Sequence, residues 1–146
     1  MASTLPPLMI LDQDKPKSEW VRFVSFDRKK DTVGDKLGVR IEMLRTRKEI
    51  TGTYELYCDD EGFYKQATYK GVNQLSNPFI DEFDLISMEF GGPLGPVAVL
   101  STRGGLNRQK LIELFRAQDK REDEEQEGPG EYETIILEAL EAYGAK

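Results

Sequence analysis

Val97-Ala98-Val99-Leu100-Ser101 is the stretch of sequence that decides the fold. Four consecutive apolar residues, two of them β-branched, favour a short strand that is buried on both of its faces. The stretch follows Gly91-Gly92-Pro93-Leu94-Gly95-Pro96, whose glycines and prolines favour a tight turn. We therefore predict a central strand over residues 97–101.

Two amphipathic helices are predicted on the C-terminal side of this strand. Asn107 is a good N-cap for a helix that ends at Gln118, with Leu111, Leu114 and Phe115 on one face. Residues 119–130 contain nothing apolar to bury, so a flexible acidic linker is expected there. A second helix is predicted over 131–143, with Gly144 as its C-cap.

The N-terminal side of the central strand has the composition of further strands. Residues 19–26 are rich in aromatic and β-branched side chains, and residues 37–45 alternate so that Val39, Ile41 and Met43 should face inward. Residues 51–58 and 63–70 flank a polar loop and predict a hairpin. Within residues 79–90 the apolar parity changes, which indicates a bulge near Leu85 and Ile86.

These elements define the expected fold class and domain organisation. A chain of 146 residues fits one domain with its own core. We expect a mainly β α+β fold, either an antiparallel sheet of about five to seven strands or a partly open small barrel, followed by the two C-terminal helices. The predicted divisions are a β-rich globular domain over 1–118, the acidic linker over 119–130 and an acidic amphipathic helix over 131–146.

The composition removes most catalytic and metal chemistry. The chain has no histidine and one cysteine, Cys58, so it can form neither a Ser-His or Cys-His pair nor an ordinary zinc site. The acids at 12–14 and 59–61 lack the ligand pattern of a calcium loop, and the turn at 101–107 matches no phosphate-binding motif. We therefore expect that the protein is not an enzyme and that it binds no cofactor or metal.

We expect the protein to be located in the cytoplasm, which could also be the cytoplasm of a host cell. No apolar run approaches the length of a membrane span, and the first residues lack the pattern of a secretory signal. A single cysteine suits a reducing compartment. We therefore expect no membrane partner.

The formal charge of −7 is distributed unevenly. Residues 117–146 hold ten acidic and three basic residues, and therefore the whole excess, whereas residues 1–116 are neutral overall. Within that neutral part, residues 15–48 hold eleven basic and five acidic residues. A basic segment of this kind can attract polyanions, and an acidic tail can compete for the same surface.

Aromatic residues interleave with cations in the strands, which leads to the first functional hypothesis. A sheet that displays both can stack unpaired bases while the cations follow the nucleic-acid backbone. The hypothesis is single-stranded nucleic-acid binding, although alternation along a strand can equally place half of these rings in the core. The candidate contacts are Trp20, Arg22, Phe23, Arg40, Tyr57, Tyr64, Lys65, Tyr69 and Lys70.

The second hypothesis is a protein-interaction module, such as a small inhibitor or a viral or phage accessory factor. Tyr132, Ile136, Leu140 and Tyr143 form an apolar stripe on the last helix, typical of a helix that docks in a partner's groove. A sheet edge could serve instead, and the stripe can equally pack on the chain's own sheet. The third hypothesis is a self-assembling structural protein, which would be a homo-oligomer.

Overall fold

One antiparallel sheet organises the chain. The computed structural model describes residues 4–65, 68–80 and 92–144. The strands are β1 (Leu8–Leu11), β2 (Val21–Val24), β3 (Ile41–Leu44), β4 (Tyr54–Asp59) and β5 (Val97–Ser101). Their order is β2-β1-β5-β4-β3, and each neighbouring pair is antiparallel.

The strand β5 lies in the centre of this sheet, as predicted. All five of its residues are buried, and its side chains divide between two hydrophobic clusters. Val97 and Val99 point to one side, here called the helical face, and Ala98 and Leu100 point to the other, here called the back face. An apolar run without alternation is the pattern of a strand covered on both faces.

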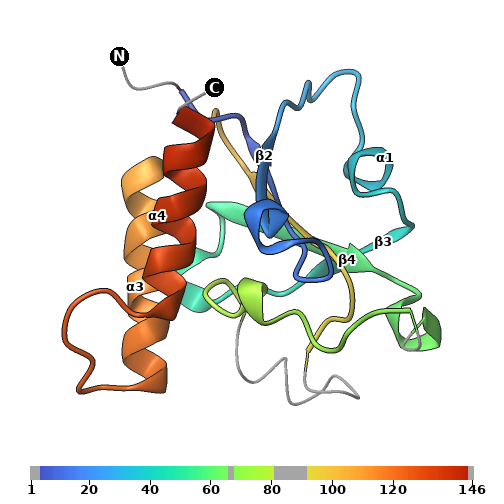
Figure 1. Cartoon of the computed structure of the whole chain (residues 1–146). Helices are drawn as coiled ribbons and strands as arrows, with labels where there is room; N and C mark the ends of the chain where they lie inside the picture. The colour runs from blue at the N-terminus through green and yellow to red at the C-terminus, as the bar shows by residue number, and fades with distance from the viewer. Residues whose placement is uncertain (1–3, 66–67, 81–91, 145–146) are drawn as a thin grey trace.

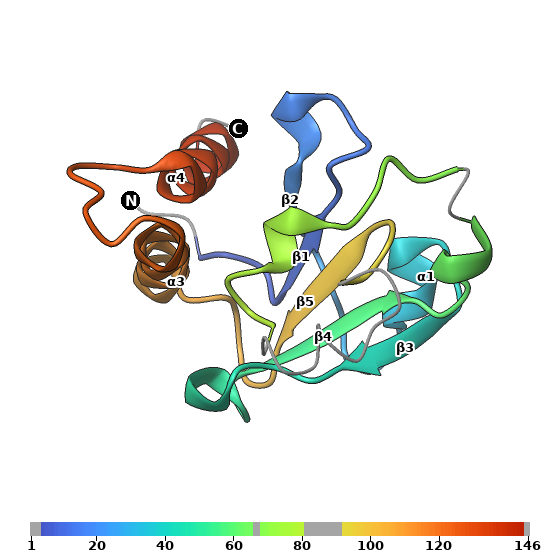
Figure 2. The ribbon, with the colours of Figure 1, turned by 90° about the horizontal axis from the view of Figure 1, so that it is seen from below.

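Helices cover both faces. The helices α3 (Arg108–Glu122) and α4 (Glu131–Gly144) lie side by side against the helical face (Figure 1). The short α1 (Val33–Leu37) lies on the opposite side of the sheet (Figure 2). The predicted α+β class, an antiparallel sheet followed by two C-terminal helices, is therefore confirmed. Single turns of 3-10 helix occupy Lys17–Glu19, Lys48–Ile50, Gly62–Lys65 and Gln74–Ser76.

Aromatic rings join the helical face of the sheet to the helices. Phe79 packs edge-on against Tyr54 of β4 and against Phe115 of α3, with 5.7 Å between ring centroids in each pair. Phe115 in turn contacts Tyr132 of α4 at 6.4 Å. Edge-to-face pairs at these distances add to the free energy gained by burying the rings.

The predicted hairpin from 51–58 to 63–70 is wrong. The strand β4 pairs with β3 and β5 instead, and the chain turns into a 3-10 helix at Gly62–Lys65. Gly62 lies so close to the turn before β5 that a Cβ atom there would stand 2.9 Å from the Leu94 carbonyl oxygen. The polar loop therefore packs against the turn before β5 and leads into a 3-10 helix rather than into a new strand.

Other sequence predictions also differ from the structure. Met43 is 60% exposed rather than inward-facing, because Leu44 is the residue that pairs with Leu56 on the helical face and neighbours on a strand face opposite sides. The strand β1 was not predicted. The bulge near Leu85 and Ile86 lies outside the residues that the structure describes.

We predict that the single thiol is unreactive in the folded protein. Burial on β4, with the Glu42 carboxylate nearby, raises the pKa of Cys58 to about 12. The thiolate fraction at about pH 8 should then be on the order of a thousandfold below that of the unfolded chain. A thiol-disulfide reagent followed by absorbance should react slowly with the native protein and rapidly in urea, and rapid native reaction would contradict this burial.

Candidate functional site

The helices α3 and α4 form a hairpin that Asp119 holds together. The Asp119 side chain on α3 accepts hydrogen bonds from the backbone N–H groups of Tyr132 and Glu133, both at 2.9 Å. These two donors belong to the first turn of α4, where backbone N–H groups have no partner within the helix. The residue is buried, so a carboxylate from one helix caps the next.

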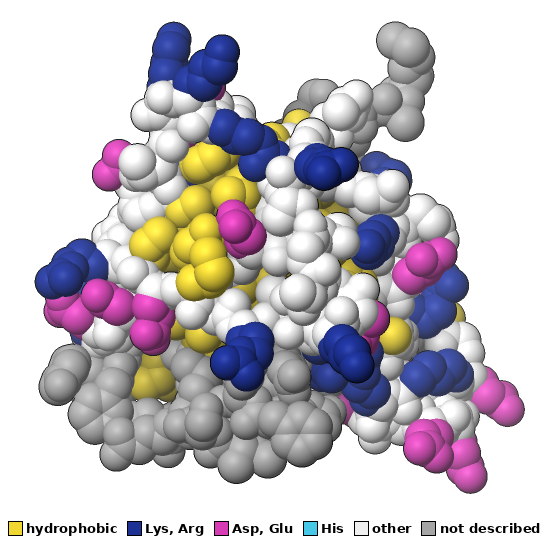
Figure 3. All heavy atoms as spheres, turned by 180° about the vertical axis from the view of Figure 1, so that it is seen from behind, with side chains coloured by type: hydrophobic (Ala, Val, Ile, Leu, Met, Phe, Trp, Pro, Cys, Tyr) yellow, Lys and Arg dark blue, Asp and Glu magenta, His cyan; other side chains and the backbone are white. Residues whose placement is uncertain are grey.

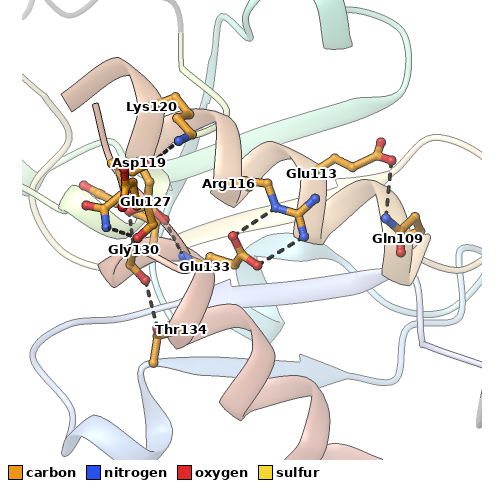
Figure 4. A network of polar contacts seen from close by, with 11 residues as sticks. Gln109, Glu113, Arg116, Asp119, Lys120, Glu127, Gly130, Glu133 and Thr134 are labelled. Carbon is orange, nitrogen blue, oxygen red and sulfur yellow. Dashed lines mark hydrogen bonds and ion pairs between the residues drawn. The ribbon is translucent and has the colours of Figure 1, made fainter. Parts of the chain in front are cut away.

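An ion pair and a glycine complete this junction (Figure 4). The guanidinium of Arg116 donates to both carboxylate oxygens of Glu133, at 2.9 and 3.1 Å. Gly130 lies against the Asp119 carboxylate so closely that a Cβ atom would overlap it. Glycine is therefore required directly before α4, and the capping side chain must come from elsewhere.

The apolar stripe predicted for a partner packs on the chain's own sheet. Tyr132, Ile136 and Leu140 are buried in the core of the helical face, and the half-buried Tyr143 packs edge-on against Phe23 at 5.4 Å. Of the two arrangements that the sequence leaves open, the structure has the helix folded back. In this fold the stripe is not available to another molecule.

Tyr132 also connects α4 to residues 74–77. Its hydroxyl donates to the Gln74 carbonyl oxygen at 3.1 Å and accepts from the Asn77 side chain at 3.2 Å. Burial raises the pKa of Tyr132 to about 12. The phenol therefore stays neutral under ordinary conditions and serves as a buried hydrogen-bonding group.

The outward side of the hairpin is strongly acidic. Eight of the ten acidic residues of 117–146 are exposed, because only Asp119 and Glu133 are buried. Residues 122–144 contain no lysine or arginine. The exposed acids, here called the acidic surface, are Glu122, Asp123, Glu124, Glu125, Glu127, Glu131, Glu138 and Glu141.

The predicted nucleic-acid contacts are mostly engaged within the chain. The Trp20 indole N–H donates to the Lys15 carbonyl oxygen at 3.0 Å, and Phe23 packs on the core. Arg40 forms ion pairs with Asp60 and Glu61 at 3.7 and 3.8 Å. Phe23 is therefore directed toward the core, whereas Trp20 is half-buried and the Arg40 side chain is 81% exposed.

Lys65 and Tyr69 meet at a buried carboxylate. The Lys65 ammonium and the Tyr69 hydroxyl donate to Asp59, at 2.8 and 2.6 Å, and the Glu61 backbone N–H donates to the other oxygen at 2.9 Å. Burial alone would raise the pKa of Asp59, but hydrogen bonds from Lys65 and Tyr69 outweigh it and lower this pKa. Burial and the Asp59 carboxylate raise the pKa of Tyr69. This carboxylate has a complete set of donors, which is typical of a structural group.

Arg22 and Tyr57 lie in one row of residues on the back face of the sheet. In the strand register, Arg22 pairs with Ile10, Ile10 with Ala98, and Ala98 with Tyr57. All four residues therefore point to the back face in one row. Lys70 is exposed outside the strands, and its backbone N–H donates to the Asp14 carboxylate at 3.1 Å, whereas the side chain of Tyr64 lies outside the described part of the structure.

The cations do not gather in one groove on the face that Figure 3 shows. Lysine and arginine side chains are spread around a hydrophobic patch, and acidic side chains stand among them, one of them beside the patch itself. Dispersed cations of this kind do not form the continuous positive track that a single strand follows. Of the proposed residues, Arg22 and Tyr57 share the back face, whereas Lys65 and Tyr69 meet at Asp59.

The described residues form neither a metal-binding cluster nor a membrane-spanning helix. Among residues 4–65, 68–80 and 92–144, no group of three or more Cys, Asp or Glu side chains is arranged to hold a metal ion. No helix in the same part of the chain is long and apolar enough to cross a membrane.

The sequence and the fold were compared with protein-family models, with curated proteins and with solved structures, and no match was found in any of the three comparisons.

Sequence reasoning missed the role of Asp119, because it placed this residue in a flexible linker. The helix α3 continues to Glu122, past the predicted end at Gln118, since Gln118 and Asp119 are both buried. One signal was present in the sequence. Gly130 stands directly before α4 and has no side chain to cap it, so the cap had to come from another residue.

We predict that removing the Asp119 carboxylate destabilises the whole domain. Asp119→Ala leaves two buried N–H groups without a partner and should lower the free energy of unfolding by about 2 kcal/mol. The control Glu124→Ala removes an exposed acid of the acidic surface and should change it by less than about 0.5 kcal/mol. Urea unfolding measures both, and equal effects would contradict the cap.

Proposed function

We propose that this protein is a non-enzymatic interaction module that binds a basic protein partner through the acidic surface of its helical hairpin. The observation that carries the proposal is the outward display of eight acids on a segment with no lysine or arginine. A tail that acted as a free polyelectrolyte would not need a buried cap, a two-pronged ion pair and an apolar inner face. A folded acidic surface provides complementarity of charge and shape together.

The exposed side of α4 also offers apolar contact. Leu137 is 38% exposed and stands beside Glu138 in the sequence of this helix. Interfaces combine apolar contacts at their centre with polar residues at the rim. Helix α4 thus has both kinds of residue on its outward side.

Removing three of the eight charges of the acidic surface should weaken partner binding. The variant Glu125→Gln, Glu138→Gln, Glu141→Gln keeps helix-forming side chains but removes three negative charges. The matched control, Asp35→Asn, Glu42→Gln, Glu113→Gln, removes three exposed charges elsewhere. Affinity capture from source cells, followed by titration of the purified captured protein, compares the two variants with the original chain.

The expected partner is basic and stoichiometric. Its affinity should fall between about 50 and 200 mM salt, as contacts between opposite charges require. The variant with three glutamines in the hairpin should bind this partner more weakly, whereas the control variant should bind it as the original chain does. Recovery of the same proteins by both variants, or of no stoichiometric protein, would overturn the proposal.

Single-stranded nucleic-acid binding is a second candidate, supported by the row that contains Arg22 and Tyr57 on the back face. If Tyr57 stacks a base, Tyr57→Ala should weaken oligonucleotide binding at low salt by about 1–3 kcal/mol. Lys70→Ala, on a separate loop, should have little effect. Titration of a labelled oligonucleotide tests the candidate, and an absence of binding at low salt would end it.

A further inference from the structure

A groove lies beside α4, between that helix and the chain segment that enters β2. One wall contains Trp20 and Val21, and the other contains Ile135, Ala139 and Ala142 of α4. Its volume is about 340 Å³, toward the small end of the range for ligand pockets in proteins. The alanines explain the space, since short side chains at these positions leave α4 separated from the indole.

The wall formed by Trp20 is held in place. The indole N–H bonds to the Lys15 carbonyl oxygen, and the Lys17 ammonium lies 5.8 Å from the centre of the ring. At the far side, the contact of Phe23 with Tyr143 joins β2 to the end of α4. A groove with fixed walls needs little ordering when it binds a ligand.

The charges around the groove favour a basic ligand. Glu138 lies in its lining, and a smaller cavity that shares Trp20 and Ile135 with the groove is lined by Glu122 and Glu131. Lys17 is the one cation among the residues that line these two described cavities. No ion pair joins Glu131 or Glu138 to the part of the chain that the structure describes.

We propose that this groove is the anchor point for the basic partner, and this inference rests on the proposed function. One apolar side chain of a basic amphipathic segment enters between Trp20 and the two alanines. Lysine or arginine residues next to it in the partner pair with Glu138 on one side and with Glu122 and Glu131 on the other. The apolar anchor supplies affinity that persists at higher salt, and the charge pairs set the orientation.

The groove contains its own reporter, because Trp20 is the one tryptophan of the chain. The probe is a synthetic amphipathic helical peptide of leucine and lysine, and its partner probe replaces every leucine with serine. Binding of the leucine peptide should shift the Trp20 emission, whereas the serine peptide should bind by charge and leave the emission unchanged. Anisotropy of a labelled peptide measures both affinities.

Filling the groove should weaken binding of the leucine peptide but not of the serine peptide. Ala142 is an exposed residue of the groove lining, so Ala142→Leu places a larger side chain in the groove. This change should weaken binding of the leucine peptide by about tenfold or more, without weakening binding of the serine peptide. The control Gln109→Leu places a leucine at an exposed position of α3, outside the groove, and should change neither affinity. Circular dichroism confirms that each variant is folded.

The outcomes distinguish the groove from the proposed function. If the leucine peptide binds equally well to Ala142→Leu and leaves the Trp20 emission unchanged, the groove is not the anchor and the acidic surface alone binds the partner. If neither peptide binds the original protein at low salt, the proposed function fails and the anchor fails with it. Should Ala142→Leu not fold, the emission shift on the original protein decides between the same results.

Discussion

The bond between the Asp119 carboxylate and the first amides of α4 is the contact on which the C-terminal third of the structure depends. The segment from Glu122 to Gly130 has no large apolar side chain to bury, so this junction and the apolar stripe of α4 attach the helix to the domain. Through the junction, the first turn of α4 is fixed against α3, and the helix presents Ile136 and Leu140 to the sheet. The positions of Glu131, Glu138 and Glu141 on α4 follow from this junction.

The junction also reaches the sheet through hydrogen bonds. Tyr132 bonds to Gln74 and Asn77, in the loop that begins at the fully buried Asn73. The Asn73 amide donates to the carbonyl oxygens of Leu11, at the end of β1, and Gly95, just before β5. Buried polar groups are costly unless they are satisfied, so such a chain of bonds specifies one arrangement of helix, loop and strand. A surface fixed in this way can recognise shape as well as charge.

The sequence predicted the features that depend on local pattern. The uniformly apolar Val97–Ser101 indicated a central strand, and Asn107 indicated the start of α3, where its side chain accepts from the Lys110 N–H at 2.9 Å. The uneven charge distribution located the candidate surface. These predictions succeeded because strand burial, helix capping and charge density are visible in neighbouring residues.

The features that the sequence did not predict depend on residues far apart in the chain. Met43 alternates correctly for a buried position, but the pairing of Leu44 with Leu56 places it outward. Asp119 resembles a linker residue until α4 returns to it, and the groove requires Trp20 and Ala142 to meet across the fold. Tertiary pairing, rather than local preference, decides such positions.

The most direct test of this account is amide hydrogen exchange along α4. If the hairpin is an integral part of the domain, the amides of residues 135–140 should open only with global unfolding and should be protected as strongly as those of β5. In Asp119→Ala, these amides should lose more protection than those of β5, whose protection should fall only by the loss of global stability. Exchange of α4 in the original protein at the rate of an unfolded chain would contradict the account, because the acidic segment would then be a free tail.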